Sequence, residues 1–491
     1  MTQTQLAFLP APAVGHLVSI IEFARHLLCR DPNFSVLVLV IKLPPPFGDD
    51  IDNYIQSISS TNDGADTRIK FLTLSRLSPP PSPSAPGLPQ SPEAVISAVI
   101  EAHKPLVKEA IILNGHVAGL VIDLFCTSMI DVANELGIPS FLFFTSSIAF
   151  LGFMLYLPIR HDRVGTGFEL DDPAESVLVP SYATPISPRF LPSVLLDNRG
   201  GGYSTMTYHG RRFWETKGII VNSFAELEPH AVKSITSLLL PGGALPPPLY
   251  PVGPLLDLKG QGQARFGKTG QRDEIMKWLD DQPEQSVIFL CFGSMGTFGE
   301  MQLKEIATGL EKSGYRFLWS IRKPPSKETL SLPGNYESYV EILPPGFQER
   351  TAGTGMICGW APQAEVLEHK AVGGFVSHCG WNSTLESVWN GVPMVAWPLY
   401  AEQQSTAVEL VRELGVAVEL RLDYRLNFDG DHQIVVAGEE IERAVRSVME
   451  EESAVRKKVK EMAGKCRAAI VDGGSSFAAI GSFLSGAILN S

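Results

Sequence analysis

Short apolar runs alternate with segments of helical period along the whole chain, and this alternation constrains the fold more than any other feature. In the first half the runs of strand length are QLAFL (5–9), SVLVLVI (35–41) and GLVID (119–123), and apolar residues recur at helical spacing over 17–28. In the second half the runs are SVIFLCFGS, FLWSI, GMICGW, GGFVSH and PMVAWPL, between 286 and 399. Such alternation builds parallel sheets covered by helices. We therefore predict an α/β protein with two doubly wound domains.

The length of 491 residues exceeds what one hydrophobic core usually serves, which also predicts two domains. A Pro- and Gly-rich stretch at 241–271 is typical of an interdomain linker with a mobile loop, and we place the boundary near Pro254. The predicted domains are 1–254 and 255–472, followed by an amphipathic C-terminal helix over 473–491. Another Pro-rich run, 79–92, is interpreted as a surface loop, with a partner-binding polyproline segment as the alternative.

Charge and cysteine usage exclude several classes of protein. The 53 acidic residues outnumber the 40 basic ones, for a net charge of -13, so we expect no nucleic-acid partner. Six scattered cysteines without a CxxC pair argue against a zinc site or a disulfide scaffold and fit reduced thiols in the cytosol. The N-terminus lacks the features of a signal peptide, and we expect a cytoplasmic protein.

The run FLFFTSSIAFLGFMLYLP (141–158) approaches the length of a membrane span. Its polar cluster of Thr145, Ser146 and Ser147 instead favours a buried strand, a turn and a core helix. We therefore predict no membrane anchor.

Polar residues are densest between Trp360 and Gln403, at the ends of short predicted strands. There, a strand runs into a Gly-containing turn, and we predict a helix opened by Asn382 or Ser383 and closed by Gly391. The free N–H groups of such a helix N-terminus suit a pyrophosphate, with His378 and the Ser383 hydroxyl as further donors. Taken singly, each residue also has a plain structural interpretation, as a cap, a core histidine or packing.

In the first half, His16 follows a predicted strand and loop, and Asp123 ends another strand. Both are expected at the carboxyl edge of one parallel sheet, where such sheets bind ligands. Histidine is the natural base for a proton transfer near neutral pH. A surface histidine at a helix start is the structural alternative.

The segment 360–403 as a whole resembles the nucleotide-sugar signature of plant secondary-product UDP-glycosyltransferases. The resemblance extends over nearly the full chain, including GHLVSIIEFARHL, GLVIDLFCTSMIDVANELGIPSF, GIIVNSFAELEP and YPVGPLL. It implies the GT-B fold, in which two Rossmann-like domains face each other across a cleft. It also implies that the first domain binds the acceptor and the second the UDP-sugar, and that the C-terminal helix returns to the first domain.

By this resemblance, Trp360 stacks on uracil and the Ala361 backbone reads the base edge. The ribose hydroxyls are bound by Gln363 and Glu386, and the phosphates by Ser294, His378, Asn382 and Ser383. The sugar is contacted by Trp381, Glu402 and Gln403. Thr145 is also assigned to the donor site. Gln403 stands where the family's glutamine is associated with glucose, which favours UDP-glucose. The chain departs from the family pattern at Glu402, where many relatives carry Asp, and at Ser405 and Thr406.

The resemblance further implies that His16 removes the acceptor proton while Asp123 orients its ring, as in a hydrolase triad without the nucleophilic serine. One direct displacement inverts the anomeric centre, and neither a metal nor any cofactor beyond the UDP-glucose co-substrate is expected. Aromatic residues assigned to the acceptor pocket are Phe125, Phe150, Phe190 and Tyr400, which suit a flavonoid, a chalcone-type or other phenolic, or a terpenoid. A UDP-sugar 2-epimerase and a non-catalytic nucleotide-sugar-binding protein are the alternatives. We expect a monomer.

Overall fold

The structure is a computed structural model that describes residues 4–43, 48–59, 66–77, 91–170, 176–240, 242–258, 269–325, 332–426 and 434–488. The chain divides into two compact units. The first comprises Met1–Asp257 together with Ala468–Ser491, and the second comprises Leu258–Arg467. The boundary predicted near Pro254 thus lies three residues before the end of the first unit's main segment.

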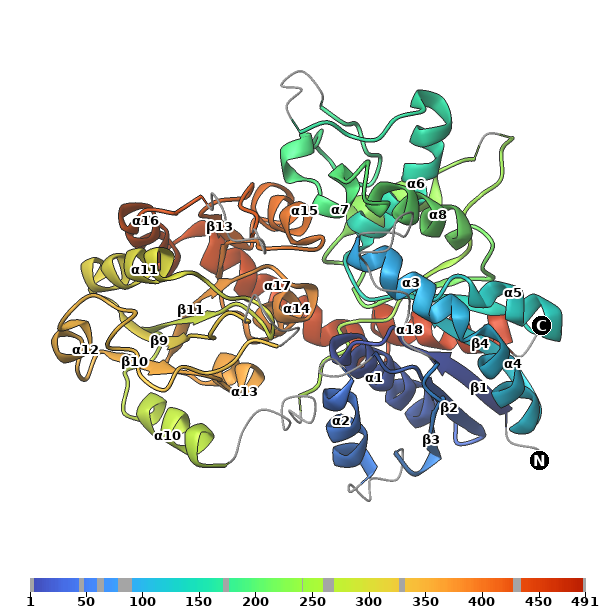
Figure 1. The fold of residues 1–491 in the computed structure, drawn as a ribbon, viewed down its shortest axis with the longest axis horizontal. Helices are drawn as coiled ribbons and strands as arrows, with labels where there is room; N and C mark the ends of the chain where they lie inside the picture. The colour runs from blue at the N-terminus through green and yellow to red at the C-terminus, as the bar shows by residue number, and fades with distance from the viewer. Residues whose placement is uncertain are drawn as a thin grey trace. The chain divides into compact units, whose positions relative to one another are not determined.

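The first unit contains, in its described residues, a seven-stranded sheet of order β3-β2-β1-β4-β5-β6-β7, in which all neighbouring strands are parallel (Figure 1). The strands are β1 (Thr4–Leu9), β2 (Phe34–Val40), β3 (Ile69–Thr73), β4 (Val117–Asp123), β5 (Ser140–Phe144), β6 (Ile219–Val221) and β7 (Leu249–Pro251). Phe8 of β1 is in register with Val38 of β2 and Val121 of β4. Because β1 continues to β2 on one side and the chain returns to β4 on the other, the strand order reverses between β1 and β4.

Helices connect these strands as the alternating pattern predicts. They are α1 (Val14–Arg30), α2 (Asp49–Ser59), α3 (Pro92–Ala102), α4 (Lys104–Leu113), α5 (Met129–Leu136), α6 (Ile148–Val164), α7 (Ser193–Leu196), α8 (Gly202–Phe213), α9 (Pro229–Thr236) and α18 (Ser475–Ser482). The run at 141–158 forms β5, a turn at Thr145–Ser147 and the mostly buried helix α6, whose N-cap is the Ser147 hydroxyl. The predicted strand, turn and core helix are therefore confirmed.

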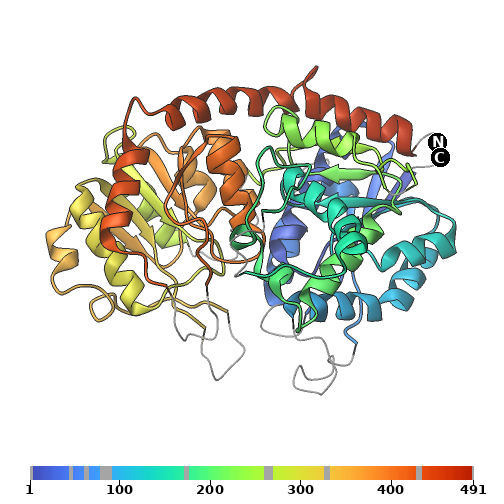
Figure 2. The ribbon, with the colours of Figure 1, turned by 90° about the horizontal axis from the view of Figure 1, so that it is seen from above.

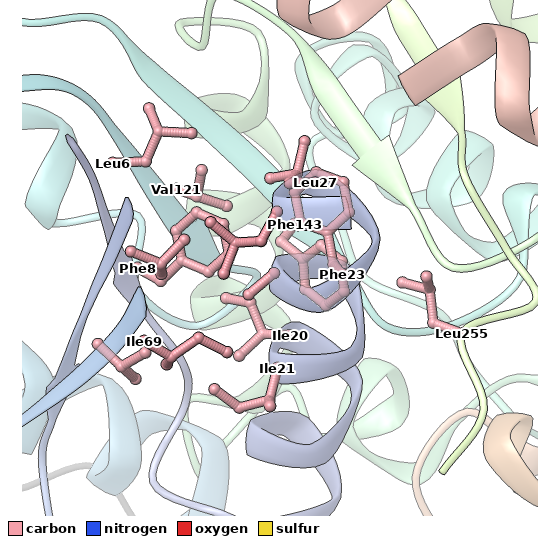
Figure 3. Close-up of a cluster of buried hydrophobic side chains, with 14 of the residues drawn as sticks. Leu6, Phe8, Ile20, Ile21, Phe23, Leu27, Ile69, Val121, Phe143 and Leu255 are labelled. Atoms are coloured by element: carbon pink, nitrogen blue, oxygen red, sulfur yellow. The ribbon is translucent and has the colours of Figure 1, made fainter. Parts of the chain in front are cut away.

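The core of the first unit forms where α1 packs on the sheet. The apolar face of α1 presents Ile20, Phe23 and Leu27 to Phe8 and neighbouring strand residues, all nearly free of solvent exposure (Figure 3). Phe8 and Phe23 stack with their centroids 5.8 Å apart. This packing fixes the beginning of α1, and with it His16, against the carboxyl end of β1.

The C-terminal helix α18 and the following turn pack on the same unit. Phe483 is buried and meets the Phe141 ring edge-on at 5.1 Å, and Ser476 Oγ donates to the Gly253 carbonyl. The Arg30 guanidinium lies 3.4 Å over the Phe477 ring. Among the described residues, one helical stretch, Ala454–Gly486, has the length and mean hydropathy of a membrane-crossing helix, with 28% of its most apolar window buried. Core helices of water-soluble proteins meet the same criteria.

The second unit repeats the architecture with a six-stranded parallel sheet in its described residues, of order β10-β9-β8-β11-β12-β13. The strands are β8 (Val287–Cys291), β9 (Arg316–Ser320), β10 (Gly355–Cys358), β11 (Val372–Ser377), β12 (Met394–Ala396) and β13 (Ala417–Glu419). The helices are α10 (Thr269–Asp280), α11 (Glu300–Ser313), α12 (Phe347–Arg350), α13 (Gln363–Glu368), α14 (Trp381–Asn390), α15 (Gln403–Val408), α16 (Gly438–Met449) and α17 (Ala454–Ile470). Figure 2 shows helices on both sides of this sheet. Two doubly wound units are thus confirmed.

Two expectations about local structure were wrong. The stretch 241–271 is not only a linker, because Leu249–Pro251 forms the edge strand β7, a position that tolerates a proline without an N–H. Helix α14 is not opened by Asn382 or Ser383: its N-cap is Gly380, which has no capping side chain. The closing residue Gly391, in the left-handed conformation, is as predicted. The Pro-rich run at 79–92 lies mostly outside the described residues, which resume at Ser91.

Candidate active site

The predicted site residues gather where each sheet reverses its strand order. In the first unit the reversal lies between β1 and β4, and the residues that follow these strands include His16 and Asp123. In the second unit it lies between β8 and β11, and Ser294 and His378 follow those strands. Crevices outside the carboxyl ends of strands at such points are where doubly wound sheets bind ligands. The reversal of strand order therefore places candidate ligand-binding residues at one crevice in each unit.

His16 and Asp123 form a hydrogen-bonded pair in the first unit. His16 Nδ1 lies 2.8 Å from Asp123 Oδ2, although 107 positions separate the residues. The Asp123 side chain is fully buried, whereas 26% of the His16 side chain is exposed. The other carboxylate oxygen, Oδ1, accepts the Phe125 backbone N–H at 3.3 Å. A buried carboxylate of this kind is stabilised by its hydrogen bonds.

This geometry determines the chemistry that the histidine offers. Since the carboxylate is an acceptor, His16 Nδ1 carries the proton and Nε2 keeps its lone pair. Because the His16 side chain is partly exposed, a lone pair on Nε2 can accept a proton from a bound hydroxyl, and the carboxylate then stabilises the imidazolium. Thr145 Oγ1 lies 3.3 Å from His16 Nδ1, so the structure brings Thr145 to this pair in the first unit.

Three of the four predicted acceptor aromatics lie in the first unit. Phe125 is half-buried, and its ring centroid is 6.3 Å from that of His16. Phe150 is only 5% exposed and stacks on Phe153, which makes it part of the core, and the half-buried Phe190 packs against the same cluster. Tyr400 belongs to the second unit, with its centroid 6.5 Å from His378. Of these four aromatic residues, Phe125 is therefore the one beside the His16–Asp123 pair.

In the second unit, two glycines make room for the imidazole of His378. A Cβ atom at Gly293 would lie 2.7 Å from His378 Nε2, and one at Gly380 would lie 2.5 Å from it. Gly293 also has a φ of +72°, which disfavours any other residue. His378 is buried, and among the described residues its Nδ1 has no hydrogen-bond partner. Burial lowers the pKa of His378 to about 4, so this imidazole is neutral at pH 7.

The start of α14 lies directly after His378 and requires an unusual backbone. Cys379 has a φ of +63°, a left-handed conformation that costs a non-glycine residue about 1 kcal/mol or more. The Ser377 hydroxyl supports it by accepting the Cys379 N–H at 3.1 Å. The turn aligns the helix N-terminus beside the histidine, and a helix N-terminus offers N–H groups and positive potential to an anion.

Three predicted donor-site residues contact one another across the start of α13 and α14. Gln363 Nε2 donates to Ser383 Oγ at 2.8 Å and to Glu386 Oε2 at 2.6 Å. Trp360, half-buried, and Ala361, buried, lie just before α13. The structure thus groups side chains that can read hydroxyl groups next to an aromatic ring that can stack.

The turn before α15 is stabilised by the side chain of Gln403. Gln403 Oε1 accepts the backbone N–H groups of Leu399 and Tyr400 at 2.9 and 3.0 Å. Ala401, inside the turn, has a φ of +53°. The Ser405 hydroxyl donates to the Glu402 carbonyl at 2.8 Å. The carbonyl end of the Gln403 amide is therefore committed to the backbone, which fixes the direction of the amide nitrogen.

The remaining predicted donor-site residues lie in both units. Thr145 joins the pair in the first unit. In the second unit, the exposed Ser294 lies on the loop after β8, and Trp381 and Asn382 lie in the first turn of α14. Among the described residues, no three His, Cys, Asp or Glu side chains are grouped so that they could hold a metal ion. The sequence reasoning missed Gly293 and Gly380, although glycines that flank a predicted anion site are a signal that could have found them.

Comparisons with known proteins agree with this geometry. A family model described as "UDP-glucoronosyl and UDP-glucosyl transferase" matches residues 250–457. The chain is 47% identical to UDP-glycosyltransferase 71K1 of Malus domestica, over 99% of this chain and 98% of that protein. It is 45% identical to UDP-glucose flavonoid 3-O-glucosyltransferase 6 of Fragaria ananassa, over 98% of each. The crystal structure of Medicago truncatula UGT71G1 complexed with UDP-glucose is similar with a TM-score of 0.86 and 44% identity, over 98% of both chains.

Proposed function

This chain belongs to the UDP-glycosyltransferase family, and from that premise we propose that it transfers glucose from UDP-glucose to a hydroxyl group of a small, largely apolar acceptor. The observation that carries the proposal is the His16–Asp123 pair, with Nδ1 and Oδ2 2.8 Å apart. A protein that only bound a nucleotide sugar would need no such pair. The matched UGT71G1 structure was solved with UDP-glucose, and several relatives are named as glucosyltransferases, which supports glucose as the sugar.

In the proposed mechanism, His16 Nε2 accepts the proton of the acceptor hydroxyl. The oxygen attacks the anomeric carbon as the bond to the diphosphate breaks, and UDP leaves with the bonding electron pair. Asp123 holds the ring in the required tautomer and stabilises the imidazolium. One displacement inverts the configuration, so an α-linked donor gives a β-linked product.

The second unit supplies the donor contacts in this proposal. Trp360 stacks on uracil, and Gln363 with Glu386 binds the ribose hydroxyls. The N-terminus of α14 and neutral His378 bind the diphosphate and stabilise its developing charge, because N–H donors fixed before the reaction cost no reorganisation during it. Glu402 and Gln403 bind the sugar hydroxyls, and Ser294 contacts a phosphate.

For the acceptor we propose a flavonoid or a related phenolic. Relatives at 42% to 45% identity include proteins named as flavonoid or flavonol 3-O-glucosyltransferases. The half-buried Phe125 ring beside His16 supports a flat aromatic acceptor, since such rings pack favourably on one another. We further propose a cytoplasmic monomer without a membrane anchor and without a cofactor.

The test incubates purified wild type and His16→Ala with UDP-glucose and a panel of flavonoids, dihydrochalcones and triterpenes, with products read by mass spectrometry. We expect a gain of one hexose with the wild type only. His116→Ala, which removes an exposed histidine of the same unit, is the matched control and should retain activity. UDP release without any acceptor would favour an epimerase or hydrolase instead, and UDP-glucose binding without product from any acceptor would refute the transferase proposal.

A further inference from the structure

His209 of α8 is a buried histidine that the proposed mechanism does not use, and it lies close to the His16–Asp123 pair. Only 1% of it is exposed. Its ring meets the Phe125 ring edge-on, with the centroids 5.8 Å apart and an interplanar angle of 84°. The same Phe125 ring lies beside His16, with the ring centroids 6.3 Å apart. The Phe125 ring therefore contacts two imidazoles, those of His209 and His16.

Both nitrogens of His209 contact hydroxyl groups from other parts of the first unit. Nε2 lies 2.8 Å from Ser97 Oγ of α3, and Nδ1 lies 2.7 Å from Thr127 Oγ1 in the turn after β4. Ser97 Oγ also lies 2.8 Å from the Glu93 carbonyl, to which it donates. These contacts join α3, α8 and the turn that carries Phe125.

The directions of these hydrogen bonds follow from counting protons. Ser97 has one hydroxyl hydrogen and gives it to the Glu93 carbonyl, so it must accept from His209 Nε2–H. Burial lowers the pKa of His209 to about 4, so the ring is neutral at pH 7 and has a single N–H. Nδ1 must therefore accept the Thr127 hydroxyl hydrogen. The relay Thr127→His209→Ser97→Glu93 carbonyl therefore uses both ring nitrogens of His209.

This relay holds Thr127, at one end of the turn after β4, and Asp123 at the other end of the same turn holds the base His16. Asp123 begins the turn, bonding His16 through one oxygen and the Phe125 N–H through the other. Thr127 ends it and is fully buried. Hydrogen bonds at both ends thus hold the turn that carries the Phe125 ring beside His16.

We infer that His209 is a positioning residue, which through Thr127 and Phe125 shapes the surface against which the acceptor lies beside His16. The inference rests on the proposed function and adds to it a residue that contacts neither substrate. A histidine with only a structural role would stabilise the fold without changing the KM for one substrate more than the KM for the other. The two roles therefore predict different kinetics.

The test compares Thr127→Val, which removes the hydroxyl and keeps the shape, with Thr127→Ser, which keeps the hydroxyl. The acceptor is the panel member that the wild type converts fastest. We expect Thr127→Val to raise the acceptor KM about fivefold or more, the factor that corresponds to the net contribution of one hydrogen bond. The KM for UDP-glucose should stay within about twofold, and Thr127→Ser should behave as the wild type.

His209→Gln and His103→Gln form a second matched pair. His103 is also buried in the first unit, where its Nδ1 contacts the Val99 carbonyl at 2.7 Å. We expect only His209→Gln to raise the acceptor KM selectively. Equal acceptor KM values for Thr127→Val and Thr127→Ser, or a parallel rise in both substrate KM values, would overturn the inference.

A readout without turnover separates this inference from the proposed function. Long-range ¹H–¹⁵N spectra distinguish the two imidazole tautomers, and we expect His209 to carry its proton on Nε2 at pH 7. A proton on Nδ1 would overturn the relay even in an active enzyme. Absence of any transfer by the wild type would instead refute the proposed function, while an Nε2 proton would still support the relay.

Discussion

Replacing Asp123 with asparagine should abolish most of the activity by reversing the tautomer of His16. The Phe125 N–H lies 3.3 Å from Oδ1 and requires an acceptor there. The asparagine oxygen will therefore face Phe125, and its NH₂ group will face His16 Nδ1, where the carboxylate now lies at 2.8 Å. Nδ1 must then accept a hydrogen bond, which moves the ring proton to Nε2. The nitrogen that should accept the substrate proton no longer has a lone pair.

General base catalysis contributes about 100-fold to 10,000-fold, so kcat should fall by about that factor. This corresponds to about 2.7 to 5.5 kcal/mol of transition-state stabilisation. The KM for UDP-glucose should not change, because no donor contact is altered. The melting temperature should change little, since the amide has the same shape and keeps both hydrogen bonds.

The assay measures initial rates by chromatography of the glucoside, with each substrate varied in turn. Asp162→Asn is the control, because it removes a surface carboxylate that pairs with Arg211 at 2.7 Å. It should leave both constants unchanged. A kcat for Asp123→Asn within about tenfold of the wild type, or a loss that arises in the KM for UDP-glucose, would refute the tautomer argument.

Four further predictions follow from the same structure. Because His209 and His378 have pKa values lowered to about 4, the unfolded chain binds protons between pH 6.5 and 4 that the folded chain does not. The free energy of unfolding should therefore fall as the pH drops, by about 2 kcal/mol per histidine between pH 7 and 5, in urea titrations. Gln403→Glu keeps the acceptor that caps the turn but removes the amide donor, so the KM for UDP-glucose should rise without loss of thermal stability, and an unchanged KM would contradict the proposed sugar contact. Ending the chain at Gly473 removes Phe483 and neighbouring buried side chains, each worth about 1.5 to 3 kcal/mol, so the protein should unfold or lose activity, as circular dichroism and product assays would reveal. EDTA should leave turnover unchanged, because the N-terminus of α14 and His378 are proposed to stabilise the leaving diphosphate, and loss of turnover would refute this.

Much of the fold could be predicted because the apolar pattern is strong. Parallel strands buried on both faces have continuous apolar runs such as 35–41, and β2 forms there with every residue buried. Strand β7 was missed because its apolar pattern is weak. β7 has three half-buried residues and contains a proline, so its pattern does not differ from that of a linker.

The candidate donor site could also be anticipated, since its residues lie within one continuous segment. The N-cap of α14 could not be anticipated, because the position of another side chain decides it. A Cβ atom at Gly380 would lie 2.5 Å from His378 Nε2, so only glycine fits there. Phe150 illustrates the same limit for the acceptor aromatics. Its ring stacks on Phe153 and is only 5% exposed, a packing that its position in the sequence does not record.

The sequence by itself determined the alternation of strands and helices, the doubly wound architecture and the types of residue that end each strand. These are local properties, set by periodicity and by residues close together in the chain. Only the tertiary structure decided that His16 meets Asp123 across 107 positions, that Thr145 joins them, and that His209 bonds Ser97 and Thr127. The physical reason is that hydrogen bonds depend on distances of tenths of an ångström, which the packing of helices on the sheet sets and which no spacing along the chain records.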